Sequence, residues 1–239
     1  MAGDEEGGLE KHVVELANCL MKHHQVTVVA HEKYRSRLKT EFIAIDLSKS
    51  RRNIIVLFQL YRALKALQSD IVHVHGNKAA AMVGSILKFL PTKSVATLHS
   101  RKKNTKMFKG FDAVIAVSPN AAETLEHPNK YIILNGIEPP ELNSDINKIT
   151  PPVVLAVGRL VPVKGFDLLI QAWQDIPNAQ LWIVGEGFEK QKLATLINEL
   201  ALQKSVKLLG FRNDITDLMQ QASLYVMSSH YEGCPYTMI

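Results

Sequence analysis

The 239-residue chain has no run of the roughly 18 apolar residues that a membrane-spanning helix needs. Its first residues, MAGDEEGG, are acidic and lack the apolar segment of a secretory signal. Only two cysteines are present, Cys19 and Cys234, and they lie too far apart in sequence to have the spacing of a metal site. These absences predict a cytoplasmic globular protein whose thiols stay reduced.

Several motifs of nucleotide-binding proteins are also missing. The sequence contains neither the phosphate loop GxxxxGK[ST] nor the dinucleotide pattern GxGxxG, which counts against a P-loop enzyme and a nicotinamide enzyme. It has no DxD pair of aspartates to hold a divalent ion, so we expect no metal cofactor. The basic segments lack interleaved aromatic residues, which counts against nucleic-acid binding.

The net charge of +5 is unevenly distributed. Residues 1–138 contain 20 lysines and arginines against 13 acidic residues, and the surplus is concentrated in Lys33–Arg52 and Arg101–Lys109. Such a surplus favours an anionic partner, such as a membrane surface or an acidic glycan, although simply solvated charge would give the same pattern.

Hydrophobic residues make up 46% of the chain, which is enough for a buried core. Short runs rich in β-branched residues alternate with segments of helical periodicity, a pattern typical of parallel strands joined by helices. We therefore predict an α/β fold. The expected strands cover residues 25–30, 42–46, 71–75, 94–99, 113–118, 131–135, 153–158, 181–185, 206–210 and 224–229, and the longer expected helices cover 54–67, 78–89, 164–173, 189–202 and 215–221.

A change in composition and periodicity near the middle of the chain predicts a division into two domains. Residues 139–152 contain four prolines and almost no periodicity, which predicts a linker. We expect one Rossmann-like domain at residues 1–138 and a second at 153–239. Both ends look unfinished, because no strand precedes the first glycine loop and the last residues stop in an expected helix. The second domain is therefore predicted to be incomplete.

Glycines and histidines mark a first candidate site. Gly7 and Gly8 precede an amphipathic helix, where free backbone N–H groups favour anions. His75 and His99 each end an expected strand, and ligands of open α/β sheets bind outside the carboxyl ends of the strands. A turn and two satisfied core histidines are the simpler alternative, and a metal site is disfavoured because no carboxylate or cysteine shares the histidine spacing.

A second candidate site follows two strands of the other half. In GRLVPVKG, Gly158 lets the strand turn, and Arg159 and Lys164 place two cations at the start of the next helix. This pattern suits a diphosphate, which accepts charge-assisted hydrogen bonds. In SSHYEGCP, Glu232 offers an acceptor for sugar hydroxyls and Gly233 offers free backbone N–H groups.

The order of these motifs resembles retaining glycosyltransferase family 4, whose members have the two-domain GT-B fold. The resemblance covers essentially the whole chain, through GGLEKHVVELANCL, DIVHVHG, SVATLHS, FDAVIAVS, ILNGIE, VGRLVPVKGFDLLIQAW, WIVGEG, VKLLGF and SSHYEGCP in that order. Each motif is moderately specific, and their ordered succession is strongly so.

The resemblance implies a role for each matching residue. His99 would lie near the reacting anomeric carbon, and Arg159 and Lys164 would hold the donor diphosphate. Glu232 matches the first glutamate of the family's E-x7-E motif, and the second would come just after Ile239. The donor-binding set implied by the resemblance and by the loops is Gly8, Gly158, Arg159, Lys164, Glu186, Phe211 and Gly233, with His99, Glu232, Arg159 and Lys164 as the catalytic set.

We therefore predict a retaining glycosyltransferase that moves a sugar from a nucleotide diphosphate-sugar, such as a UDP- or GDP-sugar, to a glycan or lipid-linked acceptor. Bacterial lipopolysaccharide or another envelope glycan is the expected product. The basic segment RKKNTKMFK after His99 could face such an acceptor at the anionic inner surface of the membrane. A sugar-nucleotide epimerase of similar architecture and an inactive truncated remnant remain as alternatives.

Overall fold

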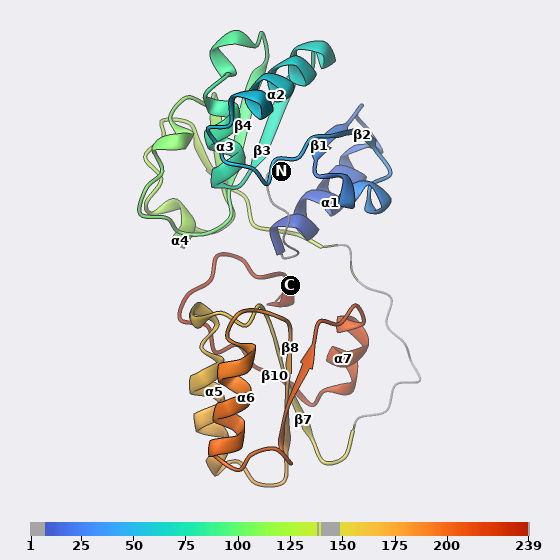
Figure 1. Ribbon diagram of the computed structural model, residues 1–239, viewed down its shortest axis with the longest axis vertical. Helices are drawn as coiled ribbons and strands as arrows, with labels where there is room; N and C mark the ends of the chain where they lie inside the picture. Colours follow the sequence, from blue (N-terminus) through green and yellow to red (C-terminus); the bar gives the residue numbers. More distant parts are fainter. Residues whose placement is uncertain (1–7, 138, 140–148, 239) are drawn as a thin grey trace. The chain divides into compact units, whose positions relative to one another are not determined.

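The computed structural model of the protein describes residues 8–137, 139 and 149–238. The chain divides into two compact units, one formed by Met1–Ile137 with Gly233–Ile239 and the other by Glu138–Glu232 (Figure 1). Most of the predicted linker lies outside the described residues. Residues 233–239, which the sequence prediction assigns to the second domain, group with the first unit, and their contacts with it include a 2.7 Å hydrogen bond from Asn135 Nδ2 to the carbonyl of Cys234.

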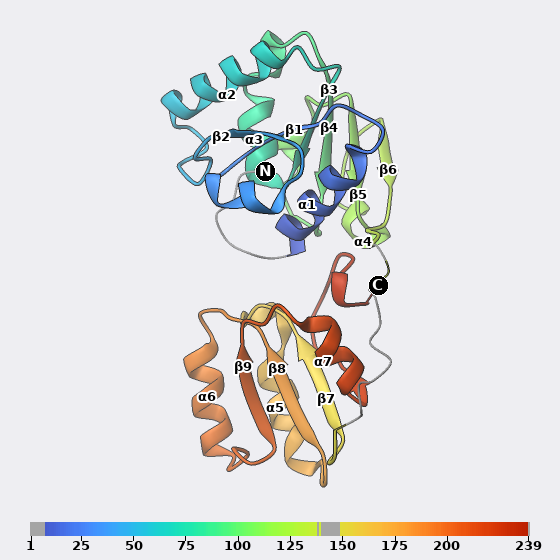
Figure 2. The same cartoon turned by 90° about the vertical axis from the view of Figure 1, so that its right-hand side faces the viewer.

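The first unit contains two parallel sheets. Four strands pair in the order β3-β4-β5-β6, and β1 pairs separately with β2 (Figure 2). Buried side chains of α2 and α3 pack with those of β3, β4 and β5 in one apolar core. The elements are α1 (Gly8–Leu20), β1 (Thr27–Ala30), β2 (Glu41–Ala44), α2 (Ile54–Leu67), β3 (Ile71–His75), α3 (Asn77–Gly84), β4 (Lys93–Leu98), β5 (Ala113–Ala116), α4 (Pro119–Ala122) and β6 (Lys130–Ile132).

The second unit is a single parallel sheet with helices on both faces. Its strands pair in the order β10-β7-β8-β9. Along β8, Leu181 and Ile183 join the core under α5 and α6, whereas Trp182 and Val184 join the core under α7, so α5 and α6 cover one face and α7 the other (Figure 1). The elements are β7 (Val153–Val157), α5 (Phe166–Ala172), β8 (Gln180–Val184), α6 (Lys190–Glu199), β9 (Val206–Gly210), α7 (Ile215–Gln221) and β10 (Leu224–Tyr225).

The order and type of the predicted elements agree with the structure, but the strands predicted over 131–135 and 224–229 are too long, since β6 ends at Ile132 and β10 at Tyr225. The bounds of α2, β3, β9 and α7 are those expected from periodicity. The predicted helix over 78–89 is wrong in length: α3 ends at Gly84, and a short 3-10 turn, η2 (Leu87–Phe89), follows it. None of the helices within the described residues is both long and apolar enough to cross a membrane.

Candidate functional site

Glycine loops in the second unit bring the ends of neighbouring strands together. Gly158 follows β7, and its N–H donates a 2.9 Å hydrogen bond to the carbonyl of Val184, the last residue of β8. The N–H of Leu160 then donates to the carbonyl of Glu186 at 2.9 Å. Gly185 has φ 142°, and a Cβ there would lie 1.9 Å from the carbonyl oxygen of Gly158. Only glycine therefore fits where these two loops cross.

Replacing Gly185 with alanine should accordingly displace the loop that carries Arg159 and lower both stability and ligand binding. We expect a loss of about 1–3 kcal/mol in the free energy of unfolding, measured by urea denaturation, because the clash is with backbone rather than with a flexible side chain. Gly110→Ala is the matched control, since a Cβ at Gly110 would meet nothing within 4 Å. Equal stability of the two variants would contradict this interpretation.

Lys164 and Glu232 form an ion pair beside these loops. Lys164 Nζ lies 2.5 Å from Glu232 Oε1, and both side chains are only 20% exposed. The same carboxylate oxygen accepts a 2.6 Å hydrogen bond from the hydroxyl of Ser229, and the hydroxyl of Ser228 donates to the carbonyl of Lys164 at 2.8 Å. These contacts hold the segment after β10 against the loop after β7. A cation and a carboxylate that are 68 residues apart in sequence therefore lie side by side.

The remaining predicted residues of the second unit lie at the same end of the sheet. Arg159 is exposed directly after Gly158, and Phe211 follows β9 with its ring exposed. Glu186 follows β8 and accepts a 2.7 Å hydrogen bond from Lys190, while a Cβ on Gly210 would lie 3.0 Å from its carboxylate. The structure therefore gathers the predicted cations, carboxylates and loop glycine at the carboxyl ends of β7–β10, where an open α/β sheet binds ligands.

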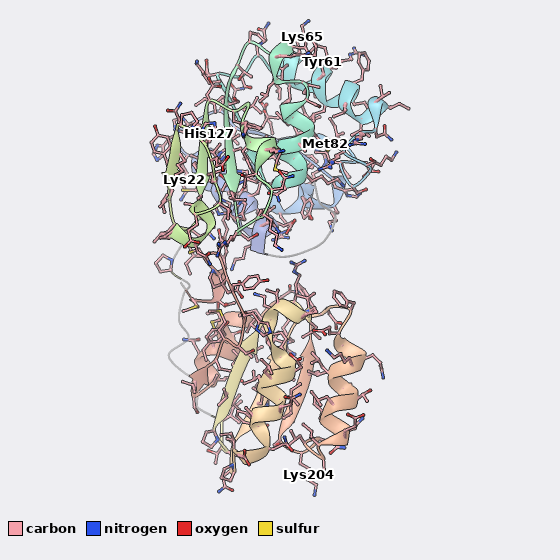
Figure 3. All side chains as sticks on the ribbon, turned by 90° about the vertical axis from the view of Figure 1, so that its left-hand side faces the viewer. Lys22, Tyr61, Lys65, Met82, His127 and Lys204 are labelled. Carbon is pink, nitrogen blue, oxygen red and sulfur yellow. The ribbon has the colours of Figure 1, made fainter. Side chains whose placement is uncertain are left out.

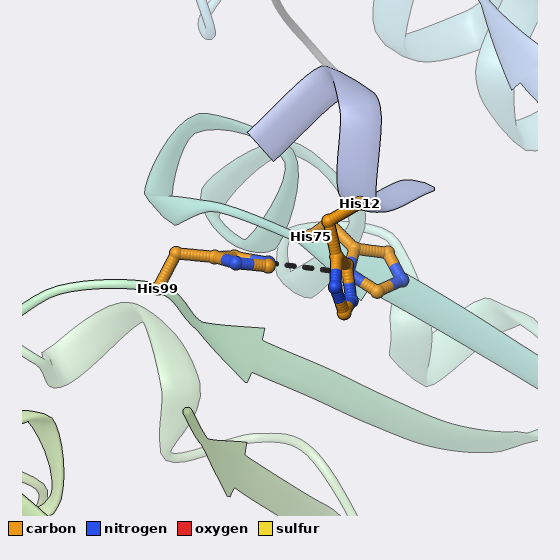
Figure 4. Close-up of side chains that lie close together, drawn as sticks. All are labelled: His12, His75 and His99. Atoms are coloured by element: carbon orange, nitrogen blue, oxygen red, sulfur yellow. Dashed lines mark hydrogen bonds between the residues drawn. The ribbon is translucent and has the colours of Figure 1, made fainter. Parts of the chain in front are cut away.

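Three histidines from three elements meet in the first unit (Figure 4). His75 ends β3, His99 follows β4, and His75 Nδ1 lies 3.3 Å from His99 Nε2. His12, from α1, places its ring 4.8 Å from that of His99 and 5.2 Å from that of His75, and its Nδ1 is 2.8 Å from the hydroxyl of Tyr236. The two predicted histidines are together, and α1 adds a third.

Burial keeps these imidazoles neutral. Together with a smaller effect of the neighbouring histidines, it lowers the pKa of His99 to about 3 and that of His75 well below its usual value. Burial likewise lowers the pKa of His73, in the middle of β3, to about 4, and that of His12 by a smaller amount. Neutral imidazoles can donate one hydrogen bond and accept another, which suits the recognition of sugar hydroxyls.

The two predicted glycines of this unit lie close to the histidines. A Cβ on Gly233 would lie 2.5 Å from the carbonyl oxygen of His99, so its backbone rests directly on the end of β4. Gly8 begins α1, one helical turn before His12, and faces Tyr236. Gly7 lies outside the described residues.

Sequence reasoning missed His12 and Tyr236. His12 could have been found from its position four residues after Gly8, which places it one turn along the predicted helix. Tyr236 carries no such signal, because its contact with His12 joins residues 224 positions apart.

The histidine cluster is also where a metal ion could be held. The ligand nitrogens of His12, His75 and His99 all lie within 4.8 Å of one another, a set that suits a transition metal. Two hydrogen bonds, between His75 and His99 and between His12 and Tyr236, already involve all three imidazoles. The expectation of no metal cofactor stays a prediction.

Each of the two units corresponds to a known family of glycosyltransferase domains. The family described as Glycosyltransferase Family 4 matches residues 6–140, and the one described as Glycosyl transferases group 1 matches residues 140–239. The chain is 24% identical to the lipopolysaccharide core biosynthesis glycosyltransferase LpsD of Rhizobium meliloti, over 95% of this chain and 70% of the relative. It is 25% identical to the UDP-Gal:alpha-D-GlcNAc-diphosphoundecaprenol alpha-1,3-galactosyltransferase of Escherichia coli, over 82% of this chain and 60% of the relative.

A solved structure shows the same fold. Anabaena Alr3699/HepE, crystallised with UDP and glucose, superposes with a TM-score of 0.79 and 20% identity, over the whole of this chain and 75% of that one. This similarity and the parallel sheets of the two units confirm the predicted Rossmann-like GT-B fold.

Proposed function

The chain belongs to glycosyltransferase family 4, and we propose that it transfers a sugar from a nucleotide diphosphate-sugar to a hydroxyl of an envelope glycan or its lipid-linked precursor, with retention of anomeric configuration. The observation that carries this proposal is the pairing of Lys164 with Glu232 beside Arg159 at the carboxyl ends of β7–β10. Two cations and a carboxylate are the groups needed for a diphosphate and a sugar hydroxyl, respectively. Gly158, Glu186, Phe211 and Gly233 complete the proposed donor-binding set.

The proposed reaction is one of leaving-group stabilisation. The bond between the anomeric carbon and the diphosphate oxygen breaks, and the acceptor oxygen bonds to that carbon. Arg159 and Lys164 stabilise the charge that develops on the departing diphosphate. The same diphosphate accepts the proton of the acceptor hydroxyl, so no protein carboxylate has to act as a base. Glu232 orients Lys164 through their ion pair and offers a second acceptor to the sugar.

The histidines contribute to sugar binding in this proposal. His99 is neutral, so its imidazole can hydrogen-bond to a sugar hydroxyl without placing a positive charge beside an anomeric carbon that itself becomes positive. His75 and His12 hold the ring of His99 in place. Gly8 and Gly233 would contribute backbone N–H groups to the ligand, and the lack of a side chain at Gly233 lets its backbone lie against the carbonyl of His99.

Names of relatives support the class of acceptor. One relative is described as acting in lipopolysaccharide core biosynthesis and another as acting on a diphosphoundecaprenol-linked sugar. The surplus of cations in residues 1–138 favours a phosphorylated, lipid-linked acceptor of this kind. We propose that the enzyme works at the cytoplasmic face of the membrane.

Thermal melting with nucleotide diphosphates tests the donor site. Melting of the chain would be followed in EDTA with UDP, GDP or ADP. We expect one of them to raise Tm by several degrees, because a ligand at 100 times its Kd stabilises the folded state by about 2.7 kcal/mol. The shift should persist in EDTA, since the two cations take the place of a metal.

Each other outcome has a definite meaning. If the protein melts cooperatively and none of the three nucleotides shifts Tm, the proposed donor site is wrong. Failure to melt cooperatively would instead indicate the inactive remnant. Conversion of a sugar nucleotide to its epimer without any acceptor would favour the epimerase, although the family match argues for a transferase.

A further inference from the structure

Helix α2 carries large apolar side chains on the face that points away from the protein. Ile54, Ile55 and Phe58 are 81%, 71% and 58% exposed. The helix is anchored by a separate row, Val56, Leu60 and Leu64, which is buried. Since residues four apart share a face, Ile54 and Phe58 lie together on the side opposite that row. A helix that only covered a core would have polar residues there.

Cations surround these apolar side chains. Arg51 and Arg52 come just before the helix, and Arg62 and Lys65 lie on the same outward face as Phe58; all four are exposed. Residues 47–69 contain five lysines and arginines and no acidic residue. The outward face is therefore both apolar and strongly positive.

The apolar area continues onto the turn after α3. Phe89, in η2, is 57% exposed, and its ring lies 6.4 Å from the ring of Tyr61 on α2. Figure 3 labels Tyr61 together with Lys65, whose Nζ donates a 3.0 Å hydrogen bond to the Tyr61 hydroxyl. We call this set the α2 surface: Ile54, Ile55, Phe58 and Phe89 with Arg51, Arg52, Arg62 and Lys65.

We propose that the α2 surface docks the protein on an anionic lipid bilayer. Apolar side chains flanked by cations fit such an interface, because the apolar groups enter the boundary between headgroups and acyl chains while the cations meet lipid phosphates. The proposal rests on the proposed function in one respect, since a lipid-linked acceptor gives the enzyme a reason to work at a membrane.

The basic segment Arg101–Lys109, singled out in the sequence, is less suited to this role. Arg101 lies 3.3 Å from Glu123, and Lys109 lies 4.0 Å from Glu126. These carboxylates offset part of the positive charge, and they would be repelled by anionic lipid. The four cations of the α2 surface flank the exposed side chains of Ile54, Ile55 and Phe58, and it is this combination of apolar and positive groups that makes it the better candidate.

Vesicle co-sedimentation tests the proposal. The protein would be mixed with vesicles of phosphatidylcholine alone or of phosphatidylcholine with phosphatidylglycerol. We expect binding to the anionic vesicles only, weakening as salt rises because the lipid charge is screened. The double variant Ile54→Ser with Phe58→Ser should bind at least about tenfold more weakly, as should Arg51→Glu with Arg62→Glu.

Matched controls test whether the loss of binding is specific to the α2 surface or follows from changing any exposed apolar or charged residue. Leu168→Ser removes an exposed apolar residue of the second unit, and Lys204→Glu reverses an exposed charge there; both should bind like the wild type. All of the variants change exposed side chains, so their Tm values should stay close to that of the wild type.

Three results would overturn the proposal. The first is a wild type that shows no binding to anionic vesicles, and the second is a set of α2 variants that bind them as well as the wild type does. The third is a wild type that is dimeric in analytical ultracentrifugation while the α2 variants are monomeric. The last result would assign the surface to a second copy of the chain. Vesicle binding needs no nucleotide, so its failure is distinct from failure of the nucleotide melting test.

Discussion

Replacing Lys164 with alanine is expected to lower kcat for sugar transfer by about 10²–10³-fold, the usual effect of removing a group that stabilises transition-state charge. The loss should appear mainly in kcat because the charge on the leaving diphosphate is greatest in the transition state. The substitution also leaves the carboxylate of Glu232 without its cation in a site that is only 20% exposed, where negative charge would repel the donor. Steady-state kinetics with a nucleotide diphosphate-sugar, in EDTA, measures the effect.

Two companion variants sharpen this experiment. Arg159→Ala should show a loss of the same kind, because we assign the second cation to the same diphosphate. Lys204→Ala, which removes an exposed lysine of the same unit, should keep wild-type turnover. Near wild-type kcat in Lys164→Ala, with an unchanged Tm, would show that the diphosphate is held elsewhere.

Acid is expected to destabilise the first unit well before it affects the second. Burial lowers the pKa of His73 from 6.5 to about 4 in the folded protein, so below pH 6.5 the unfolded chain binds more protons than the folded chain. The contribution of the neutral histidine to stability is therefore complete above pH 6.5 and is lost as the pH falls towards 4. For His73 alone the loss is on the order of 3 kcal/mol, and His75 and His99 add to it in the same direction.

The two units can be followed separately. Both tryptophans, Trp173 and Trp182, lie in the second unit, so their fluorescence reports its unfolding. Hydrogen exchange of peptides that cover β3 and β4 reports the first unit, after correction for the pH dependence of intrinsic exchange. We expect protection in β3 and β4 to fall between pH 6.5 and 4 while tryptophan fluorescence changes less.

A single substitution checks the cause. His73→Gln removes the titrating group and keeps a donor for the hydroxyl of Thr97, which His73 Nε2 contacts at 2.8 Å. This variant should show a shallower loss of protection with acid, whereas His24→Gln, at an exposed position after α1, should behave like the wild type. Protection that does not depend on pH in the wild type would contradict the assignment.

Periodicity was sufficient to predict most of the elements because the core follows it directly. In α2 the buried residues Val56, Leu60 and Leu64 recur every four positions, and β3 (IVHVH) and β9 (VKLLG) are short segments made mostly of aliphatic residues. Bounds were less predictable where a helix ends on small residues. Gly84 is a common kind of residue at a helix end, but apolar residues continue the periodicity after it through Ile86, Leu87 and Phe89, so the predicted helix ran on past the end of α3.

The donor-side residues were also accessible from sequence, since each follows a strand within a few positions. Gly158, Arg159 and Glu186 come directly after β7 and β8, and the carboxyl ends of parallel strands lie at one edge of a sheet. The same reasoning placed His75 and His99 together. His73 lies two positions before His75 in β3, so the alternation of side chains along a strand already places both rings on one face, where their centroids lie 4.2 Å apart.

By itself, the sequence determined the class of fold, the order of the motifs that follow the strands, and the family. These depend on the local periodicity of apolar residues and on motifs that are contiguous in the chain. Only the tertiary structure decided that Lys164 pairs with Glu232, that Tyr236 contacts His12, and that the outward face of α2 is apolar and positive. The first two facts join residues 68 and 224 positions apart, and the third depends on which side of a helix the core covers. Contacts of that range are set by how the chain closes on itself, and no local pattern records them.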